Sequence, residues 1–148
     1  MLYLDSSALV KRYLLEKGSS EVAAICATSH PVYTSSLSYA ELVATFARKA
    51  RERLLSPQDF DAILSTFLAE WTMGINEIPI DRGILAALPP LFRAHPLRGS
   101  DGVHLASALW LQKTAQSAAA PFLFGAADER LIAAATSSGL PVFNPEIP

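Results

Sequence analysis

Residues 1–11, MLYLDSSALVK, decide the fold of this chain. Residues 2–4 are apolar and too few to form the core of a helix, so they predict a short buried strand of a parallel sheet. Either of the two following serines can cap a helix that residues 8–15 carry and that Gly18 ends. A strand that passes directly into a helix at the start of the chain predicts an α/β architecture.

Strands and helices alternate along the rest of the sequence. Runs rich in Val, Tyr, Ile or Phe predict further strands at residues 31–34, 75–80, 122–124 and 142–143. Cap signals and helical stretches predict helices at residues 20–28, 38–54, 57–71, 101–113 and 128–137, and one that starts at Asp81 and is interrupted by Pro89 and Pro90. A Ser- and Ala-rich connector is expected over residues 114–121. Strands separated by helices indicate a mainly parallel sheet in one domain over residues 1–148.

The composition narrows the class of protein. A chain of 148 residues can bury a core without disulfides or a structural metal. The single cysteine, Cys26, excludes an internal disulfide and a cysteine-based zinc site. The start of the chain lacks the basic region of a signal peptide, and no apolar run approaches membrane-spanning length, so a cytoplasmic protein with no membrane contact is expected.

The charge distribution is uneven. A formal net charge of −2 argues against nucleic-acid binding through a globally basic surface. Basic residues nevertheless gather near one predicted helix end, at Arg48, Lys49, Arg51 and Arg53, where they also favour the helix dipole. A hydrophobic fraction of 51% and a mean hydropathy of +0.27 indicate a surface that a partner covers.

Four acidic residues, Asp5, Glu41, Asp101 and Asp128, lie near the ends of predicted elements. In open parallel sheets, ligands bind at the carboxyl ends of the strands, so this topology can bring the four together. Clustered carboxylates repel one another and raise each other's pKa, and a divalent cation keeps them ionised. Oxygen ligands suit Mg²⁺ and Mn²⁺, so the pattern predicts metal-dependent phosphodiester chemistry.

Each acid also has a structural interpretation. Glu41 with Ser38 has the spacing of a capping box. Asp101 can cap a helix or favour its first turn, and Asp128 can begin a helix within a solvated charge run. Asp5, directly after an apolar strand, needs a cap, a cation or water. The functional interpretation depends on the joint placement of the four residues.

Three neighbours of these acids are further candidates. Ser7 can orient the carboxylate of Asp5 or cap the following helix. His104 stands three residues after Asp101, which gives either a metal-binding pair or a packed, hydrogen-bonded histidine. Arg98 can pair with Asp101 or face a substrate phosphate. The chain contains no Gly-x-Ser-x-Gly elbow, phosphate loop or dinucleotide fingerprint.

Four blocks together carry a resemblance to a known family. They are LYLDSSALVK at residues 2–11, SSLSYAEL at 35–42, LRGSDGVHLASAL at 97–109 and FGAADERLIAAA at 124–135. In this order, and over essentially the whole chain, they closely resemble PIN-domain ribonucleases, and within them the VapC-type toxins of bacterial toxin–antitoxin pairs. The resemblance implies a three-layer α/β/α sandwich with a mainly parallel central sheet.

The resemblance also implies a site and partners. Asp5, Glu41 and Asp101 match the core carboxylates that hold Mg²⁺ or Mn²⁺ for endonucleolytic RNA cleavage. Asp128 matches a fourth, more variable acid, and Ser7 a small hydroxyl residue. Asp5 and Asp101 are the leading direct metal ligands, while Glu41 and Asp128 bind a second metal or position the attacking water. The family implies a homodimer and a cognate antitoxin protein that blocks the site.

The sequence differs from the family pattern at two places, and two alternative functions remain open. Gly102 stands where such toxins often carry a helix former and is expected to loosen the first helical turn, and the connector over residues 114–121 is long for the class. A phosphatase-type phosphoryl-transfer enzyme is one rival, but it needs a second Asp where this chain has Ser7. The other rival is a non-catalytic interaction module that binds a cation for stability alone.

Overall fold

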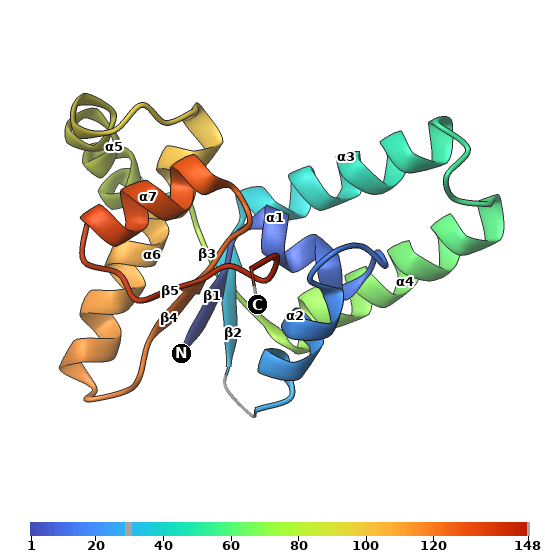
Figure 1. Ribbon diagram of the computed structural model, residues 1–148, viewed down its shortest axis with the longest axis horizontal. Helices are drawn as coiled ribbons and strands as arrows, with labels where there is room; N and C mark the ends of the chain where they lie inside the picture. The colour runs from blue at the N-terminus through green and yellow to red at the C-terminus, as the bar shows by residue number, and fades with distance from the viewer. Residues whose placement is uncertain (29–30, 148) are drawn as a thin grey trace.

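The computed structural model describes residues 1–28 and 31–147. Its five strands form one sheet with the order β3-β2-β1-β4-β5, and every neighbouring pair is parallel (Figure 1). The strands are β1 (Leu2–Leu4), β2 (Val32–Ser35), β3 (Ile75–Ile78), β4 (Leu123–Gly125) and β5 (Val142–Phe143). The predicted strands and the parallel sheet are therefore confirmed, with ends that shift by one or two residues.

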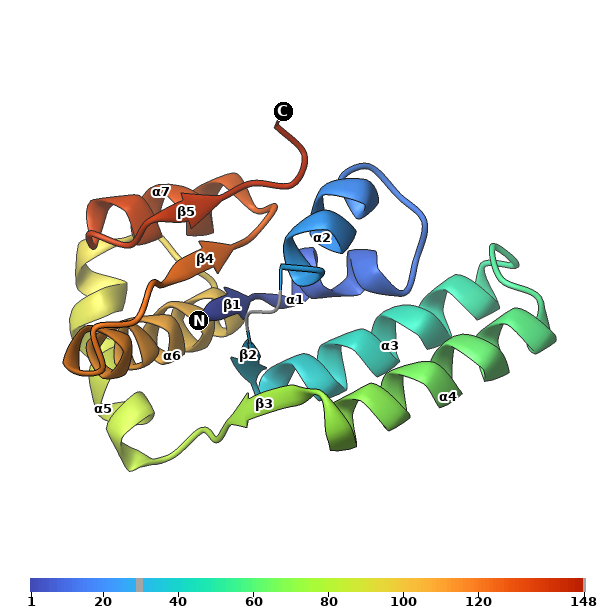
Figure 2. The same ribbon diagram turned by 90° about the horizontal axis from the view of Figure 1, so that it is seen from below.

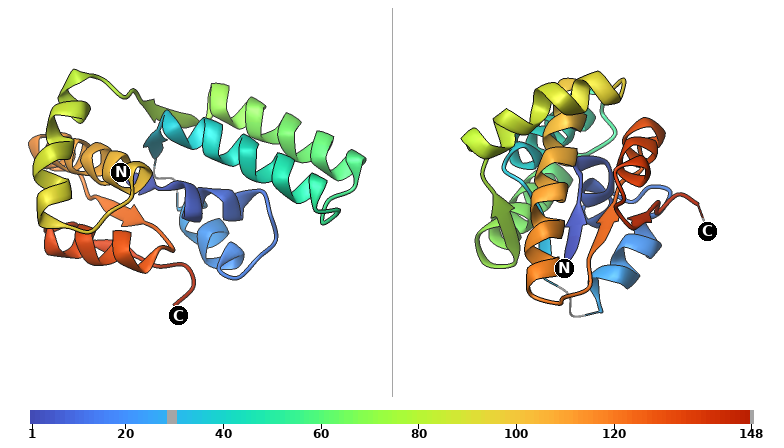
Figure 3. Two further views of the ribbon diagram at one scale, coloured as in Figure 1. Left: turned by 90° about the horizontal axis from the view of Figure 1, so that it is seen from above. Right: turned by 90° about the vertical axis from the view of Figure 1, so that its left-hand side faces the viewer.

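Helices connect the strands. They are α1 (Ser6–Leu9), the short 3₁₀ helix η1 (Val10–Arg12), α2 (Ser19–Cys26), α3 (Leu37–Arg51), α4 (Pro57–Met73), α5 (Arg82–Ala94), α6 (Gly99–Ser117) and α7 (Glu129–Ser137). Figure 2 shows the sheet between α1 to α4 on one side and α5 to α7 on the other, and the right-hand view of Figure 3 looks onto the α5 to α7 side, with the sheet behind it. The three-layer α/β/α sandwich is confirmed.

Strand β1 contributes side chains to two hydrophobic cores, one on each face of the sheet. Leu2 and Leu4 point to the core beneath α1 to α4, which includes Phe46 and Phe67. Tyr3 points to the opposite core, formed with Leu105 of α6 and residues of α7. All three strand residues are buried, as expected for a central parallel strand with helices on both faces.

The first helix ends earlier than the sequence predicts. Residues 6–9 are α-helical and residues 10–12 are 3₁₀-helical, instead of one helix carried by residues 8–15. The backbone amides of Tyr13 and Leu14 both donate to the carbonyl of Val10, and the helical segment ends after this turn. Gly18 does not end this helix. It precedes α2 with φ of 86°, and a Cβ at Gly18 would lie 2.7 Å from the carbonyl oxygen of Pro145.

Helix α5 begins as predicted, because the Asp81 side chain accepts a hydrogen bond from the Ile84 amide at 2.9 Å. The predicted interruption at Pro89 and Pro90 is wrong, since the helix continues to residue 94. The carbonyls that the prolines leave unpaired belong to exposed residues 85 and 86, where water can reach them. The opposite face of α5 packs against α6 and holds the helix together.

Helix α6 is longer than predicted. It runs through residue 117, so half of the predicted connector is helical. Ala115 in this last part is fully buried, and its burial explains why a Ser- and Ala-rich stretch stays helical. Within residues 1–28 and 31–147, no helix is long and apolar enough to cross a membrane.

Helices α3 and α4 form a hairpin that projects away from the sheet (Figure 1). The Ser56 hydroxyl accepts a hydrogen bond from the Asp59 amide at 3.0 Å, and Pro57 begins α4, as predicted. Phe46 of α3 and Phe67 of α4 pack with their ring centroids 5.7 Å apart. The hairpin is therefore joined to the sheet through aromatic residues that belong to the same core as Leu2 and Leu4 of β1.

Candidate active site

The four acidic residues meet in one cavity at the carboxyl edge of the sheet. Asp5 directly follows β1, Asp128 lies three residues after β4, Glu41 is in α3 and Asp101 is in the first turn of α6. All four line a cavity of about 500 Å³, together with Ser7, Arg98 and His104. The cavity lies where the strand order reverses at β1 and β4, which is the ligand position expected of this topology.

Asp5 is held in place by the element that it begins. Its carboxylate caps α1 by accepting a hydrogen bond from the Ala8 amide at 2.9 Å. The Ser7 hydroxyl lies 2.7 and 2.9 Å from the two carboxylate oxygens. The side chain is 4% exposed, and this burial, together with nearby Glu41, raises the pKa of Asp5, although His104, Ser7 and Ala8 act in the opposite direction.

Ser7 joins two segments that are far apart in sequence. Its hydroxyl donates to Asp5 and accepts a hydrogen bond from the Ala127 amide at 2.8 Å. The contact ties the loop before Asp128 to the segment after β1. The structure thus shows the orienting contact with Asp5, whereas the N-cap of α1 is Asp5 and neither of the two serines.

Glu41 does not form the capping box that its spacing with Ser38 suggested. Helix α3 already begins at residue 37, and the Ser38 hydroxyl lies 2.6 Å from Oγ1 of Thr34. Glu41 Oε2 instead accepts a hydrogen bond from the Ser6 hydroxyl and lies 3.0 Å from Nε2 of His104. Burial would raise the pKa of Glu41, but these two contacts outweigh it and hold the pKa below its ordinary value.

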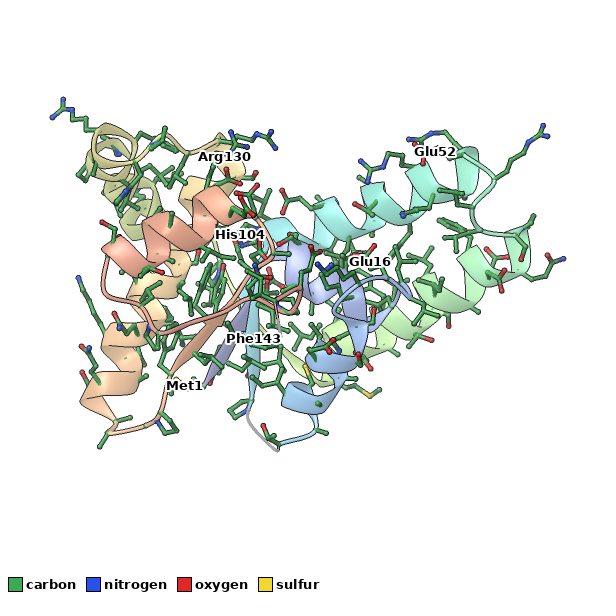
Figure 4. All side chains as sticks on the ribbon, viewed as in Figure 1. Met1, Glu16, Glu52, His104, Arg130 and Phe143 are labelled. Carbon is green, nitrogen blue, oxygen red and sulfur yellow. The ribbon has the colours of Figure 1, made fainter. Side chains whose placement is uncertain are left out.

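His104 is a buried, hydrogen-bonded residue, which confirms one of its two interpretations. It is 2% exposed, and its Nδ1 lies 2.9 Å from the hydroxyl of Tyr3. Figure 4 shows His104 near the centre of the molecule, and this residue also lines the cavity. Ser6, which contacts both Glu41 and His104, was missed by the sequence interpretation. Its place directly after Asp5, at the same edge of the sheet, is the signal that could have identified it.

Asp101 and Asp128 are turned toward the helices that they help to begin. The Asp101 carboxylate accepts a hydrogen bond from the Arg98 amide at 3.0 Å. The Asp128 carboxylate accepts from the amides of Arg130 and Leu131 at 2.9 and 3.0 Å. Asp128 is therefore the N-cap of α7, as its structural interpretation predicted, whereas Asp101 is a first-turn residue of α6 whose N-cap is Arg98. Capping and cavity lining coexist, because both carboxylates also border the cavity.

Comparison with known proteins identifies the family. The PIN domain family model matches residues 2–142. This chain belongs to the PIN-domain family. It is 33% identical over 109 residues to Ribonuclease VapC45 of Mycobacterium tuberculosis (strain CDC 1551 / Oshkosh) and to Ribonuclease VapC49 of M. tuberculosis (strain ATCC 25618 / H37Rv). Each match covers 74% of this chain and 75% of the relative, so within the PIN-domain family the chain belongs with the VapC ribonucleases.

Solved structures share the PIN-domain fold. FitAcB from Neisseria gonorrhoeae superposes with a TM-score of 0.67 and 19% identity over 100% of both chains. VapBC2 from Rickettsia felis, bound to a DNA fragment from their promoter, gives 0.61 and 13% identity over 97% and 98%. A toxin–antitoxin complex from Klebsiella pneumoniae gives 0.60 and 18% identity over 98% of each chain. At these identities the likeness concerns the fold.

The donor chemistry of the PIN-domain cavity suits a hard cation. Its four carboxylates supply the oxygen ligands that Mg²⁺ and Mn²⁺ prefer. Within residues 1–28 and 31–147, no three Asp, Glu, His or Cys side chains are grouped closely enough to hold a metal as they stand. Asp101 and Asp128 each bond to backbone amides through only one of their two carboxylate oxygens, Oδ2 of Asp101 and Oδ1 of Asp128.

Cations also line the cavity. Lys11 is 5% exposed and is paired with Glu16 at 3.1 Å and with Glu146 at 2.7 Å. Burial would lower the pKa of Lys11, but its contacts with Glu146 and Glu16 outweigh it and raise that pKa. Arg48 and Lys49 line the cavity farther along α3 and have no such partners among the described residues. Lys11 is therefore neutralised within the fold, whereas the α3 cations are available to a ligand.

Proposed function

We propose that this PIN-domain protein is a metal-dependent endoribonuclease, a hydrolase of RNA phosphodiester bonds, and the toxin of a type II toxin–antitoxin system. The observation that carries the proposal is the convergence of Asp5, Glu41, Asp101 and Asp128 on one cavity at the carboxyl edge of the sheet. Family membership with the VapC ribonucleases supports RNA as the substrate. The toxin–antitoxin complexes among proteins of the same fold support a cognate antitoxin as partner.

We assign the cation to the four carboxylates. Asp5 and Asp101 are the proposed direct ligands of Mg²⁺ or Mn²⁺, and Glu41 and Asp128 are proposed to hold a second cation or to orient water. When bound, such a cation supplies positive charge to the scissile phosphate and acidifies water for attack at neutral pH. No nucleophilic side chain is required.

The residues of the chain prepare this chemistry by fixing carboxylate positions. Ser7 and the Ala8 amide hold Asp5, so that its oxygens keep one orientation in the cavity. Ser6 and His104 hold Glu41, and its lowered pKa keeps it ionised, so it can accept a hydrogen bond from water. Water attacks phosphorus in line and gives up a proton to solvent, while the P–O bond to the leaving oxygen breaks and that oxygen takes up a proton from solvent.

Cleavage of a labelled, mixed-sequence RNA with Mg²⁺, Mn²⁺ or EDTA tests the proposal. We expect cleavage by the wild type only with a cation, and a loss of about 100-fold or more in Asp5→Asn and in Asp101→Asn. Asp61→Asn, which changes an exposed carboxylate of α4, is the matched control and is expected to be fully active. Cleavage in EDTA, or full activity of both site variants, would contradict the proposal.

The assembly remains part of the proposal. A homodimer, a single domain over residues 1–148 and a cytoplasmic location are predictions from sequence. Light scattering on the purified protein tests the dimer, since a monomer at micromolar concentration would exclude it. The phosphatase-type alternative is disfavoured by Ser7, whose hydroxyl is engaged by Asp5 and the Ala127 amide.

A further inference from the structure

One wall of the carboxylate cavity is formed by a single face of α3. Glu41, Thr45, Arg48 and Lys49 all line the cavity, and their spacing places them on one side of the helix. Helix α3 leads away from the sheet, with His104 beside its inner end and Glu52 at its outer end (Figure 4). The wall therefore changes along its length from an acidic inner part to a basic outer part.

The two basic residues on this wall are not neutralised by the acids that share the cavity. Neither Arg48 nor Lys49 forms an ion pair with any residue in 1–28 or 31–147. Along the helix axis, Arg48 stands about 10 Å beyond Glu41, too far for a direct contact. Lys11 in the same cavity differs, because Glu16 and Glu146 neutralise it.

We propose that Arg48 and Lys49 form a binding site for backbone phosphates of RNA, a few nucleotides to one side of the cleaved bond. The strand leaves the carboxylates along the basic part of α3. This inference rests on the proposed ribonuclease function and deepens it, because it assigns the path of the substrate. Arg48 offers a planar pair of donors to phosphate oxygens and Lys49 offers a point charge, so the site grips the backbone without reading the bases.

The competing explanation is the helix dipole. Arg48, Lys49 and Arg51 all lie at the end of α3, where cations stabilise the helix by themselves. Arg51 and the nearby Arg53 are exposed and do not line the cavity. They carry the same charge at the same helix end. Replacing them should therefore affect helix stability without affecting RNA binding, which distinguishes the two explanations.

The test compares Arg48→Gln/Lys49→Gln with Arg51→Gln/Arg53→Gln in the full-length protein. Steady-state cleavage of a single-stranded RNA is measured at several salt concentrations. In the cavity variant we expect KM to rise about 10-fold while kcat changes less than about twofold. The slope of log(kcat/KM) against log(salt) should become shallower by about 1.4, because two phosphate contacts to a single strand are lost. The control variant is expected to keep the wild-type KM and slope.

A second measurement keeps the inference separable from the proposed function. Binding of the same RNA in EDTA, followed by fluorescence anisotropy, needs no cleavage and should show the same loss in the cavity variant alone. If the wild type binds in this way but never cuts RNA, the ribonuclease proposal fails and the phosphate site stands. Equal KM and equal RNA binding in both double variants, with only a lowered melting temperature, would overturn the site. A wild type that neither cuts nor binds RNA would overturn both.

Discussion

Nε2 of the His104 ring lies 3.0 Å from Oε2 of Glu41, on the inner wall of the carboxylate cavity. Burial would raise the pKa of Glu41, and the contact with His104 helps to lower it below its ordinary value. The carboxylate is therefore ionised and can only accept a hydrogen bond. Nε2 must therefore carry the hydrogen. The Tyr3 hydroxyl, 2.9 Å from Nδ1, holds the other edge of the ring. A tyrosine of the central strand thus fixes the orientation of Glu41 through the histidine.

Replacing Tyr3 by Phe tests this chain of contacts. The variant leaves Nδ1 of the buried His104 without its partner, which should lower the free energy of unfolding by about 1–3 kcal/mol. Because Glu41 loses an oriented donor, the Mn²⁺ concentration for half-maximal cleavage should rise about 10-fold. Urea unfolding and a Mn²⁺ titration measure the two effects. Tyr33→Phe on β2 is the matched control, and an unchanged Mn²⁺ requirement in Tyr3→Phe would show that the chain of contacts is structural only.

Asp5 is expected to reduce stability in the absence of a cation. Burial raises its folded-state pKa, so ionised Asp5 destabilises the fold at neutral pH, and this destabilisation disappears as the pH falls through the folded pKa. Asp5→Asn keeps an acceptor for the Ala8 amide and should unfold with a free energy about 1 kcal/mol higher at pH 7 in EDTA. At pH 3 the gain should vanish.

The sign should reverse when Mg²⁺ or Mn²⁺ is added. A cation that binds only the folded state raises wild-type stability according to its concentration relative to Kd, and Asn at position 5 removes a proposed ligand. Melting curves at pH 7 with EDTA and with millimolar cation should therefore cross over between the two proteins. A wild-type melting temperature that is the same with and without the cation would contradict a metal site at Asp5.

The sequence predicted the sheet because its signals are local. Each short apolar run, such as residues 2–4 or 122–124, fits one buried strand, and parallel pairing follows from the intervening helices. Asp81 and Ser56 were recognised as caps for the same reason, since their partners lie three residues away. The helical prolines of α5 were misjudged because packing against α6, which no local signal reports, keeps that helix continuous.

The sequence identified most of the residues that line the site, but it did not predict most of the contacts between them. The four acids could be placed from the ends of predicted elements, and they share a cavity. The contact of Ser6 with Glu41 spans 35 residues and that of Tyr3 with His104 spans 101, so neither could be deduced from spacing. The capping-box alternative for Glu41 was wrong, because it rested on the sequence spacing to Ser38, whereas Ser38 bonds to Thr34 of β2.

The carboxyl-terminal segment should contribute to stability through Lys11. Glu146→Gln removes the 2.7 Å ion pair but leaves Glu16 as a partner, so the free energy of unfolding should fall by less than about 1 kcal/mol for this partly exposed pair. The pKa of Glu146 is lowered chiefly by Lys11, so its contribution is present above the ordinary Glu range and is lost as the pH falls through the folded pKa. The raised pKa of Lys11 means that its contribution is lost as the pH rises through that pKa.

Unfolding measured at pH 3, 7 and 11 tests this pair. The difference between wild type and Glu146→Gln should be largest at pH 7 and smaller at both extremes. Glu129→Gln, which changes an exposed acid of α7, is the control and should show no such maximum. A difference that is equal at all three values would mean that position 146 acts through packing and not through charge.

Gly102 is expected to be required for the packing of α6 against Phe92 of α5, and not to loosen the first turn of α6. A Cβ at this position would lie 2.5 Å from Cζ of Phe92 on α5, so Gly102→Ala must displace that ring. The overpacking is worth about 1–3 kcal/mol and should exceed the gain of about 1 kcal/mol from helix propensity. We therefore expect Gly102→Ala to lower the free energy of unfolding in the wild-type background. In a Phe92→Ala background the ring is absent, and the same substitution should raise stability by about 1 kcal/mol. Urea unfolding of the four proteins measures this change of sign, and a destabilising effect of equal size in both backgrounds would rule out the contact with Phe92 as its cause.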